Sequence, residues 1–238
     1  MRLDVALVDR GLARSRNQAA VCIRQGLVTV DGERISKPSH VVGEDTVIQA
    51  DADPWVSRAA HKLVGALETS GTAVGGRVLD AGASTGGFTQ VCLQRGAHTV
   101  FAVDVGHEQL ARELRDDPRV TVREGLNLRD LTLGDLDGEP VDTVVGDVSF
   151  ISLRLILEPI LSVLRPGGTA LLLVKPQFEV GRELLGEGGV VRDPELQRAA
   201  VASVLEMANS LGWRCDWQGE SVLPGTAGNV EFFVRLNG

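Results

Sequence analysis

The stretch Val78-Leu-Asp-Ala-Gly-Ala-Ser-Thr-Gly-Gly-Phe-Thr-Gln90 decides the fold, because an apolar strand runs into an acid, a glycine-rich turn and the start of a helix. The glycines at 82, 86 and 87 allow the backbone to turn sharply and to approach a ligand closely. The helix that follows presents unpaired N–H groups in its first turn, where polar and anionic ligands bind. The stretch therefore predicts a strand-turn-helix unit that binds a cofactor.

The acid in this turn favours one class of cofactor. A dinucleotide-binding turn reads G-x-G-x-x-G, whereas this turn reads D-x-G-x-S-x-G-G, with Asp80 at the end of the strand. A carboxylate there can pair with the amino group of S-adenosylmethionine (SAM), which favours SAM over NAD. A second apolar strand ends in Asp104, where an acid receives ribose hydroxyls of either cofactor. Any nucleotide-binding unit of this type remains the alternative interpretation.

Length and composition limit the class of protein. The 238 residues, 43% of them hydrophobic, suffice for one domain of ordinary size and a small module. Apolar stretches are too short to span a bilayer and the N-terminus lacks a signal-peptide core, so we expect a cytoplasmic protein without membrane contact. Cys22, Cys92 and Cys215 are odd in number and widely spaced, and they form no ligand motif with the histidines. Neither a disulfide framework nor a metal site is indicated.

Charge is distributed unevenly along the chain. The formal net charge is −8, which disfavours a polyanionic partner for the chain as a whole. Residues 1–24, however, contain five arginines and two aspartates. If RNA binds, we expect it at this end, on Arg10, Arg14, Arg16 and Arg24. The alternative is that these arginines form the solvated faces of two helices.

Two regions follow from the pattern of apolar residues and turns. Residues 1–50 predict two short helices and a small β unit, and residues 51–58 predict a linker. Residues 59–238 predict alternating helices and strands, and thus an α/β doubly wound parallel sheet. The glycine-rich residues 176–192 are a candidate lid. The strands are expected near 77–80, 99–104, 119–123, 143–147, 170–174, 213–222 and 230–236.

Four charged residues are expected around the cofactor turn: Lys62, Asp147, Lys175 and Glu231. Each alone is explained equally well as a solvated or capping charge. Asp147 and Lys175, however, terminate two apolar strands at their carboxyl ends, where α/β enzymes place their chemistry. We therefore interpret the four residues together as a candidate catalytic site.

This order of lysine, aspartate, lysine and glutamate around the glycine turn resembles the RrmJ/FtsJ-type ribose 2′-O-methyltransferases. Four strings resemble the TlyA family in particular: Ser57-Arg-Ala-Ala-His-Lys-Leu63, Asp147-Val-Ser-Phe-Ile-Ser-Leu153, Val174-Lys-Pro-Gln-Phe-Glu-Val-Gly181 and Gly228-Asn-Val-Glu231. Gly11-Leu-Ala-Arg-Ser-Arg16 and Val30-Asp-Gly32 are similar to the S4 RNA-binding domain that this family places first. The resemblance covers nearly the whole chain.

The resemblance implies a Rossmann-like SAM-dependent methyltransferase domain at 59–238, preceded by a small α+β S4-like RNA-binding domain at 1–50. It implies transfer of a methyl group from SAM to a cytidine ribose 2′-OH in ribosomal RNA within ribosomal subunits, in the large subunit and for some members also the small. No metal is implied, and the oligomeric state is left open. The cofactor-binding residues expected on this basis are Asp80, Gly82, Ala83, Ser84, Gly86, Gly87, Asp104, Val105, Asn127 and Asp147.

Each charged residue has an expected role. Lys175 would accept the proton of the ribose hydroxyl, which is a weak nucleophile at neutral pH. Lys62 and Glu231 would orient the ribose and Lys175, and Asp147 would hold the lysines in register. Aromatic residues that could stack on a base are few, and each is more readily explained as part of the core. These are Phe150, Phe178, Phe232 and Trp55.

Three alternative functions remain open at this stage. The family also carries the name hemolysin, which suggests a membrane-active protein, although the short apolar runs argue against insertion. The methyltransferase domain could be inactive, leaving an RNA-binding module. The enzyme could also act on another RNA, such as tRNA.

Overall fold

The computed structural model describes residues 1–51 and 53–238. The chain divides into two compact units, Met1–Pro54 and Trp55–Gly238. The expected linker, 51–58, includes residue 52, which lies outside the described residues, and its extent stays a prediction.

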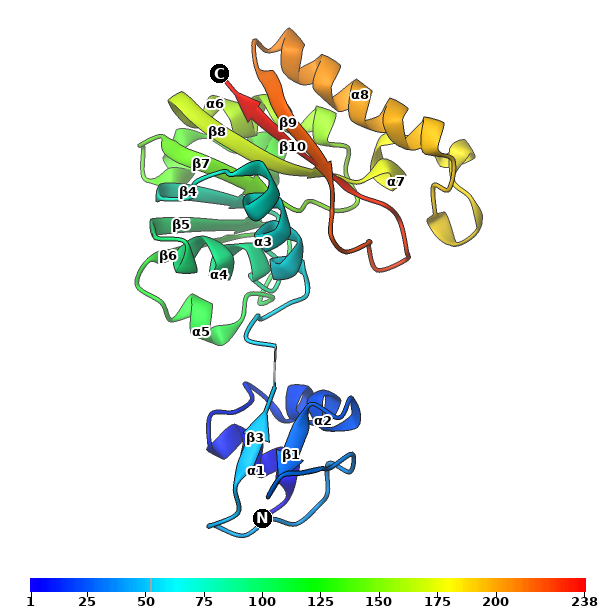
Figure 1. The fold of residues 1–238 in the computed structure, drawn as a ribbon. Coiled ribbons are helices and arrows are strands. Elements are labelled where there is room, and N and C mark those ends of the chain that lie inside the picture. The colour runs from blue at the N-terminus through cyan, green and yellow to red at the C-terminus, as the bar shows by residue number, and fades with distance from the viewer. Residues whose placement is uncertain (52) are drawn as a thin grey trace. The chain divides into compact units, whose positions relative to one another are not determined.

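The N-terminal unit is a small α+β module (Figure 1). Its helices are α1 (Leu3–Asp9) and α2 (Arg16–Arg24), and its strands are β1 (Val28–Val30), β2 (Glu33–Arg34) and β3 (Ile48–Ala50). The strands form an antiparallel sheet in the order β2-β1-β3. Ser15 caps α2, since its hydroxyl accepts the N–H of Gln18 at 3.2 Å. Asp31 and Gly32, which both have positive φ, form the tight turn between β1 and β2.

The C-terminal unit is built on one seven-stranded sheet in the order β6-β5-β4-β7-β8-β10-β9. The first five of these strands are parallel, as the sequence predicts. β10 is antiparallel to both β8 and β9, so the sheet is mixed, and β9 runs in the same direction as the first five strands. The strands are β4 (Gly76–Ala81), β5 (Ala97–Asp104), β6 (Val120–Glu124), β7 (Val141–Gly146), β8 (Leu164–Val174), β9 (Arg214–Glu220) and β10 (Phe232–Asn237).

Helices cover both faces of this sheet (Figure 1). The α-helices are α3 (Ala59–Ser70), α4 (Gly87–Gln94), α5 (Arg112–Arg115), α6 (Leu157–Ser162), α7 (Pro176–Glu179) and α8 (Pro194–Ser210). Short 3₁₀ turns lie between them, namely η1 (Leu128–Asp130), η2 (Leu133–Leu136), η3 (Leu153–Leu155), η4 (Arg182–Leu184) and η5 (Glu187–Gly189). The candidate lid, 176–192, thus contains α7 and two of these turns.

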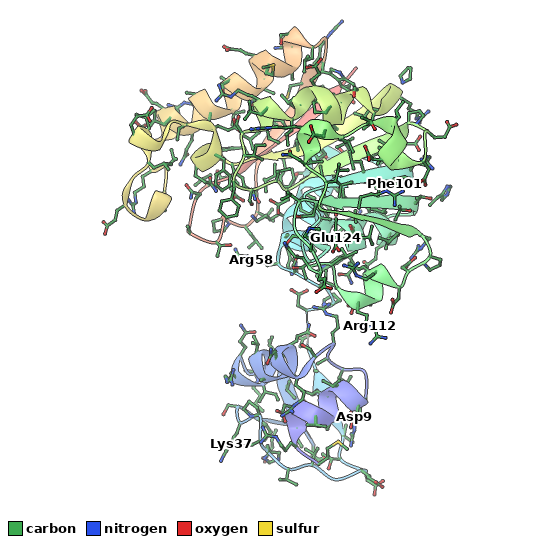
Figure 2. All side chains as sticks on the ribbon, turned by 180° about the vertical axis from the view of Figure 1, so that it is seen from behind. Asp9, Lys37, Arg58, Phe101, Arg112 and Glu124 are labelled. Carbon is green, nitrogen blue, oxygen red and sulfur yellow. The ribbon has the colours of Figure 1, made fainter. Side chains whose placement is uncertain are left out.

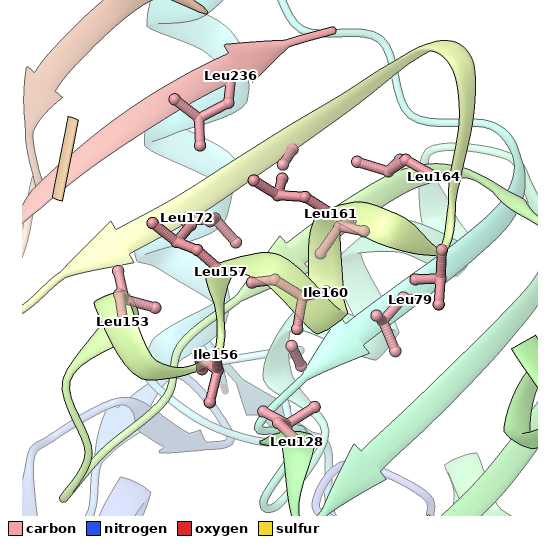
Figure 3. Packing of buried hydrophobic residues seen from close by; sticks show 14 of the residues in the cluster. Leu79, Leu128, Leu153, Ile156, Leu157, Ile160, Leu161, Leu164, Leu172 and Leu236 are labelled. Carbon is pink, nitrogen blue, oxygen red and sulfur yellow. The ribbon is translucent and has the colours of Figure 1, made fainter. Parts of the chain in front are cut away.

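Alternation along the strands produces two cores, one on each face of the sheet. In β4, Val78 belongs to the core beneath α3 and α4, whereas its neighbour Leu79 belongs to the core beneath α6 and α8. Figure 3 shows the second core, where Leu157 and Ile160 of α6 pack near Leu79. Because both faces are buried, the central strands are continuously apolar. The carboxyl ends of β4, β5, β7 and β8 are thereby fixed relative to one another.

Two further features of the described structure concern the packing of the sheet and the length of the helices. Phe101, labelled in Figure 2, lies on β5, and the Arg77 guanidinium carbon is 4.8 Å from the centre of its ring. This contact is near the opposite end of the sheet from the strand tips and belongs to the packing. Of the helices in residues 1–51 and 53–238, none is long and apolar enough to cross a membrane.

Candidate active site

The glycine-rich turn after β4 adopts the conformation that its glycines predict. Gly82 has φ +83° and Gly86 has φ +98°, and the helix α4 begins at Gly87. A Cβ atom at Gly82 would lie 3.2 Å from the carbonyl oxygen of Asp147 and 3.2 Å from the Cα atom of Val148. The turn therefore passes so close to the segment after β7 that a side chain at position 82 is crowded as well as strained.

The acid at the end of β5 holds two backbone segments beside this turn. Oδ2 of Asp104 accepts the N–H of Ser84 at 2.9 Å, and Oδ1 accepts the N–H of Gly106 at 2.7 Å. The hydroxyl of Ser84 donates to Oε1 of Gln109 at 3.1 Å. Each carboxylate oxygen has a second lone pair, so Asp104 keeps acceptor capacity for ligand hydroxyls.

Two cavities open at the carboxyl edge of the sheet. One has a volume of about 530 Å³ and is lined by all four predicted catalytic residues. The other has a volume of about 420 Å³ and is lined by Asp104, Val105 and Asn127. Gly82, Ser84 and Asp147 line both cavities, together with Ser149 and Phe150. The two cavities therefore meet at the glycine turn and Asp147.

The four predicted catalytic residues form two ion pairs. Nζ of Lys62, on α3, lies 2.6 Å from Oε2 of Glu231, and both side chains are buried. Nζ of Lys175, after β8, lies 2.6 Å from Oδ1 of Asp147, after β7. Buried charges are stable only when paired, so removing one partner of such a pair leaves a costly isolated charge. The structure brings the four residues together around one cavity.

Two further residues join these pairs, and the sequence reasoning missed both. Nζ of Lys175 donates to the hydroxyl of Ser149 at 2.6 Å. The side-chain amide of Gln177 donates to Oε1 of Glu231 at 3.3 Å. Ser149 lies two residues after Asp147, and Gln177 lies two residues after Lys175. Their position just beyond the predicted strand ends was the available signal.

Asp80 is placed differently from the other expected cofactor residues. Its side chain is fully buried, Oδ2 accepts the hydroxyl of Thr89 at 2.6 Å, and Oδ1 has no hydrogen-bond partner among the described residues. Burial raises the pKa of the Asp80 carboxyl to about 7. Neither Asp80 nor Gly86 lines either cavity. The carboxylate on the cavity surface at this point is that of Asp147.

The raised pKa of Asp80 gives stability a defined pH dependence. The folded state holds this proton up to about pH 7, whereas an ordinary aspartate releases it near pH 3.8. Wild type should therefore lose stability progressively as the pH rises from the lower to the higher of these values. Asp80→Asn cannot ionise and keeps an acceptor for Thr89. We expect the free energy of unfolding of this variant, relative to that of wild type, to be higher at pH 7.5 than at pH 4.5 by a few kcal/mol, as measured by melting at the two pH values. An equal difference at both pH values would contradict the buried, destabilised carboxylate.

An aromatic pair lies at the cavity. Phe150 has φ +65° and is 92% exposed, and its ring centre lies 5.4 Å from that of Phe178. Both residues line the larger cavity. A non-glycine residue with positive φ is strained, and exposure of its apolar ring to water is unfavourable, which makes Phe150 a candidate for ligand contact. Phe150 is therefore not a core residue, contrary to the more conservative interpretation of the sequence.

Three of the four N-terminal arginines have partners within their own unit. The guanidinium of Arg10 donates to the carbonyls of Thr46, Gly43 and Glu44. Arg14 donates to the carbonyl of Pro54. Arg16, with Arg2, contacts the buried Asp4, and the hydrogen bond from Arg2 is the main cause that lowers the pKa of Asp4 to about 2. Arg24 lies exposed at the end of α2.

The arrangement has a clear chemical capacity. A glycine-lined cavity that contains Asp104 meets a second cavity that contains two amines and two carboxylates. The first can hold a nucleoside cofactor, and the second can orient a hydroxyl and remove its proton. Among the described residues no group of His, Cys, Asp and Glu is arranged to hold a metal ion.

Comparisons with known proteins assign the two units to families. Residues 55–238 match the FtsJ-like methyltransferases, and residues 1–48 match the S4 domain. A Mycobacterium tuberculosis protein named 16S/23S rRNA (cytidine-2′-O)-methyltransferase TlyA is 51% identical over 239 residues, covering 99% of this chain and 89% of its own. A Campylobacter jejuni protein named 23S rRNA (cytidine-2′-O)-methyltransferase TlyA is 32% identical over 254 residues, covering 98% of each chain.

A solved structure is similar to the whole length of this chain. A protein from Streptococcus thermophilus, named provisionally as a hemolysin, superposes with a TM-score of 0.77 at 38% identity, covering 100% of this chain and 88% of its own. The similarity thus extends over both units in sequence and in fold. The chain belongs to the FtsJ-like methyltransferases and, within them, to the TlyA family, with an S4 domain at its N-terminus.

Proposed function

We propose that this enzyme transfers the methyl group of SAM to the ribose 2′-oxygen of a cytidine in ribosomal RNA, and that it does so in the cytoplasm on ribosomal subunits. The observation that carries the proposal is the single cavity in which Lys62, Asp147, Lys175 and Glu231 meet the glycine turn. The names of relatives at 51% and 32% identity support the same substrate. These observations favour methyl transfer over a membrane-active role, because paired amines and carboxylates around a cavity suit proton transfer and not insertion into a membrane.

The residues of the two cavities fit SAM. Gly82 lines both cavities and lets the turn lie against the backbone of Asp147, which a Cβ atom would crowd. Asp104 would receive the ribose hydroxyls, and Ser84, Val105 and Asn127 would complete the adenosine side. Asp147, which lines both cavities, would pair with the amino group, the role that the sequence alone suggested for Asp80. When bound, SAM supplies a methyl group that its sulfonium already activates.

Lys175 would serve as the general base. To accept the proton of the ribose hydroxyl, its amine must first be uncharged, a change that the ion pair with Asp147 opposes and that the Ser149 hydroxyl accommodates. The Ser149 hydroxyl accepts from Nζ when the amine is charged and can donate to Nζ when it is not, so the hydrogen bond persists in both states. Asp147 would fix the position of the amine at 2.6 Å. An amine held in this way can contribute about 10²–10⁴-fold to the rate.

Lys62 and Glu231 would hold the acceptor ribose. The Glu231 carboxylate is fixed from two sides, by Nζ of Lys62 and by the amide of Gln177. Because these side chains are buried and paired, they are ordered before the substrate arrives. Such preorganisation lowers the entropic cost of aligning the 2′-oxygen with the methyl group.

Phe150 would stack on the target base. The ring is exposed at the cavity and braced by Phe178, and stacking on an aromatic side chain is worth about 1–3 kcal/mol per base. Phe150→Leu keeps an apolar side chain but removes the ring. We expect its KM for the RNA substrate to rise about tenfold, with SAM affinity unchanged, in steady-state assays. An unchanged KM for RNA would exclude Phe150 as a stacking residue.

The S4 domain would supply affinity for RNA. Arg24, which is exposed, is better placed to contact phosphates than Arg10, whose guanidinium is occupied by backbone carbonyls. Arg14 and Arg16 would contribute to the same positive surface while keeping their contacts within the unit.

A methyl-transfer assay in which each RNA substrate is offered separately tests the proposal. SAM labelled in its methyl group would be incubated with the protein and, in separate reactions, 30S subunits, 50S subunits, tRNA and protein-free ribosomal RNA. We expect label in the RNA of the 50S subunit, with Lys175→Met as the inactive control. Label only in tRNA would show a different substrate, and label in none of the RNAs would contradict the proposed reaction.

A further inference from the structure

A buried carboxylate lies just outside the catalytic cavity. Glu179 is the last residue of α7, and its side chain is 1% exposed. Oε1 accepts the backbone N–H of Leu153 at 2.7 Å, and Oε2 accepts the hydroxyl of Ser152 at 2.5 Å. None of these three residues lines either of the two cavities at the strand tips. The carboxylate is thus committed to the protein itself and not to a ligand.

Arg154 completes the contacts of this carboxylate. Nε of Arg154 lies 3.4 Å from Oε2 of Glu179, and Nη2 donates to the Glu179 carbonyl at 3.2 Å. Nε also donates to the Ser152 hydroxyl at 3.2 Å. The side chain of Arg154 is 42% exposed, so the charge of Glu179 is balanced from the solvent side. We refer to Glu179, Ser152, Arg154 and the N–H of Leu153 as the carboxylate clamp.

The carboxylate clamp joins two segments that carry the catalytic groups. Residues 147–154 follow β7 and contain Asp147, Ser149 and Phe150, whereas residues 175–179 follow β8 and contain Lys175. The parallel pairing of β7 with β8 extends only to Gly146 and its partner Leu172. Beyond that point the strands no longer hold the segments together, and the clamp supplies hydrogen bonds between them.

The clamp also supports a strained residue. Phe150 has φ +65°, a conformation that persists only where the surrounding structure enforces it. Glu179 anchors the chain within a few residues on the C-terminal side of Phe150, and the N–H of Asp147 is bonded to the carbonyl of Ala81 on the other side. Phe150 therefore lies in a short segment that is fixed at both ends.

We propose that Glu179 is a positioning residue for methyl transfer: its carboxylate holds residues 147–154 against residues 175–179, and so keeps Nζ of Lys175 within reach of both Asp147 and Ser149. The inference rests on the proposed function. Displacing a catalytic group by about 1 Å can cost about 100-fold in rate, so a clamp remote from the reacting atoms can control turnover. Asp104 and Asn127 make no contact with the clamp, although residues 147–151 line the same cavity as they do.

Two variants act on the clamp from opposite sides. In Glu179→Gln, an amide nitrogen, which accepts no hydrogen bond, replaces one carboxylate oxygen. Either the Ser152 hydroxyl or the N–H of Leu153 then loses its acceptor. Arg154→Gln removes the guanidinium from a partly exposed position, so it tests the same clamp even if Glu179→Gln folds poorly. Glu183→Gln, at an exposed position in η4, is the matched control for loss of a carboxylate. Val204→Ala, in the core beneath α8, is the control for loss of stability alone.

The decisive assay is the single-turnover rate on 50S subunits at saturating SAM, with SAM affinity measured by calorimetry. At saturating SAM we expect Glu179→Gln to lower the rate at least about 30-fold and Arg154→Gln about tenfold. SAM affinity should weaken by a smaller factor, because residues 147–151 also line the cofactor cavity. Glu183→Gln and Val204→Ala should keep the wild-type rate below their melting temperatures. If wild type is active and Glu179→Gln stays within about threefold of it, the positioning role is wrong while the proposed function stands.

Amide hydrogen exchange gives a readout that does not need activity. In Glu179→Gln we expect faster exchange in peptides covering 147–154 and 175–180, and unchanged exchange in peptides covering 80–90. Glu183→Gln should resemble wild type throughout. Unchanged exchange in both clamped segments would overturn the proposal even if wild type proved inactive on ribosomal RNA.

Discussion

Lys175→Arg should abolish methyl transfer while leaving SAM affinity within about twofold of wild type. Guanidinium keeps the positive charge but does not release its proton in a protein, so it cannot serve as the base. The loss should reach about 10²–10⁴-fold, the range for a positioned general base. Lys175→Met, which removes both charge and acceptor, should be equally inactive. Single-turnover assays with saturating SAM and 50S subunits measure the effect.

The matched control is Lys37→Arg, the same substitution at an exposed position of the N-terminal unit, which Figure 2 labels. This variant should retain the wild-type rate. If Lys175→Arg instead reacts within about threefold of wild type, the barrier has changed by only ~0.7 kcal/mol and Lys175 is an electrostatic clamp, not the base.

Gly82→Ala should weaken SAM binding by about 30-fold, or roughly 2 kcal/mol. The new Cβ atom would sit 3.2 Å from the carbonyl oxygen of Asp147, and the residue would have to keep φ +83°. Relief of the contact would push the segment that carries Asp147 away from the turn. Since Asp147 lines both cavities, cofactor binding and catalysis should suffer together. Calorimetric titration with SAM measures the first effect.

Gly96→Ala separates crowding from backbone strain. Gly96 has φ +99°, but a Cβ atom there would meet no atom within 4 Å. Both variants therefore carry a similar conformational cost, about 1–2 kcal/mol, and only Gly82→Ala disturbs the cavity. Gly96→Ala should lose melting temperature yet bind SAM normally. Equal SAM affinities for the two variants would show that position 82 does not border the cofactor.

The sequence predicts those site residues that directly follow a strand. Asp147 and Lys175 each follow an apolar strand, and parallel strands place their carboxyl ends at one edge, so their proximity could be inferred. Glu231 and Lys62 are supported only as members of the group of four and by the family resemblance, because nothing local distinguishes a catalytic charge on α3 or beside β10 from a solvated one. The parallel core followed from the alternation of strands and helices.

Other features depend on tertiary contacts that local patterns do not encode. The antiparallel direction of β10 follows from the connection after β9, which returns the chain to lie between β8 and β9. Asp80 lies one residue before the end of β4, which reaches Ala81, and its side chain bonds Thr89 of α4, so the cavity presents Asp147 instead. Nothing in the sequence around Glu179 distinguishes it from an ordinary surface glutamate, and only the fold shows that its carboxylate is buried against Ser152. Arg10 likewise looked like a free cation until its carbonyl partners were known.

Nucleoside analysis of the methylated RNA tests the central claim most directly. Ribosomal RNA from 50S subunits treated with the protein and isotopically labelled SAM would be digested to nucleosides and separated by mass spectrometry. Our account predicts label in 2′-O-methylcytidine, and none when Lys175→Met replaces wild type. Label on the base of cytidine, or on the ribose of another nucleoside only, would contradict it.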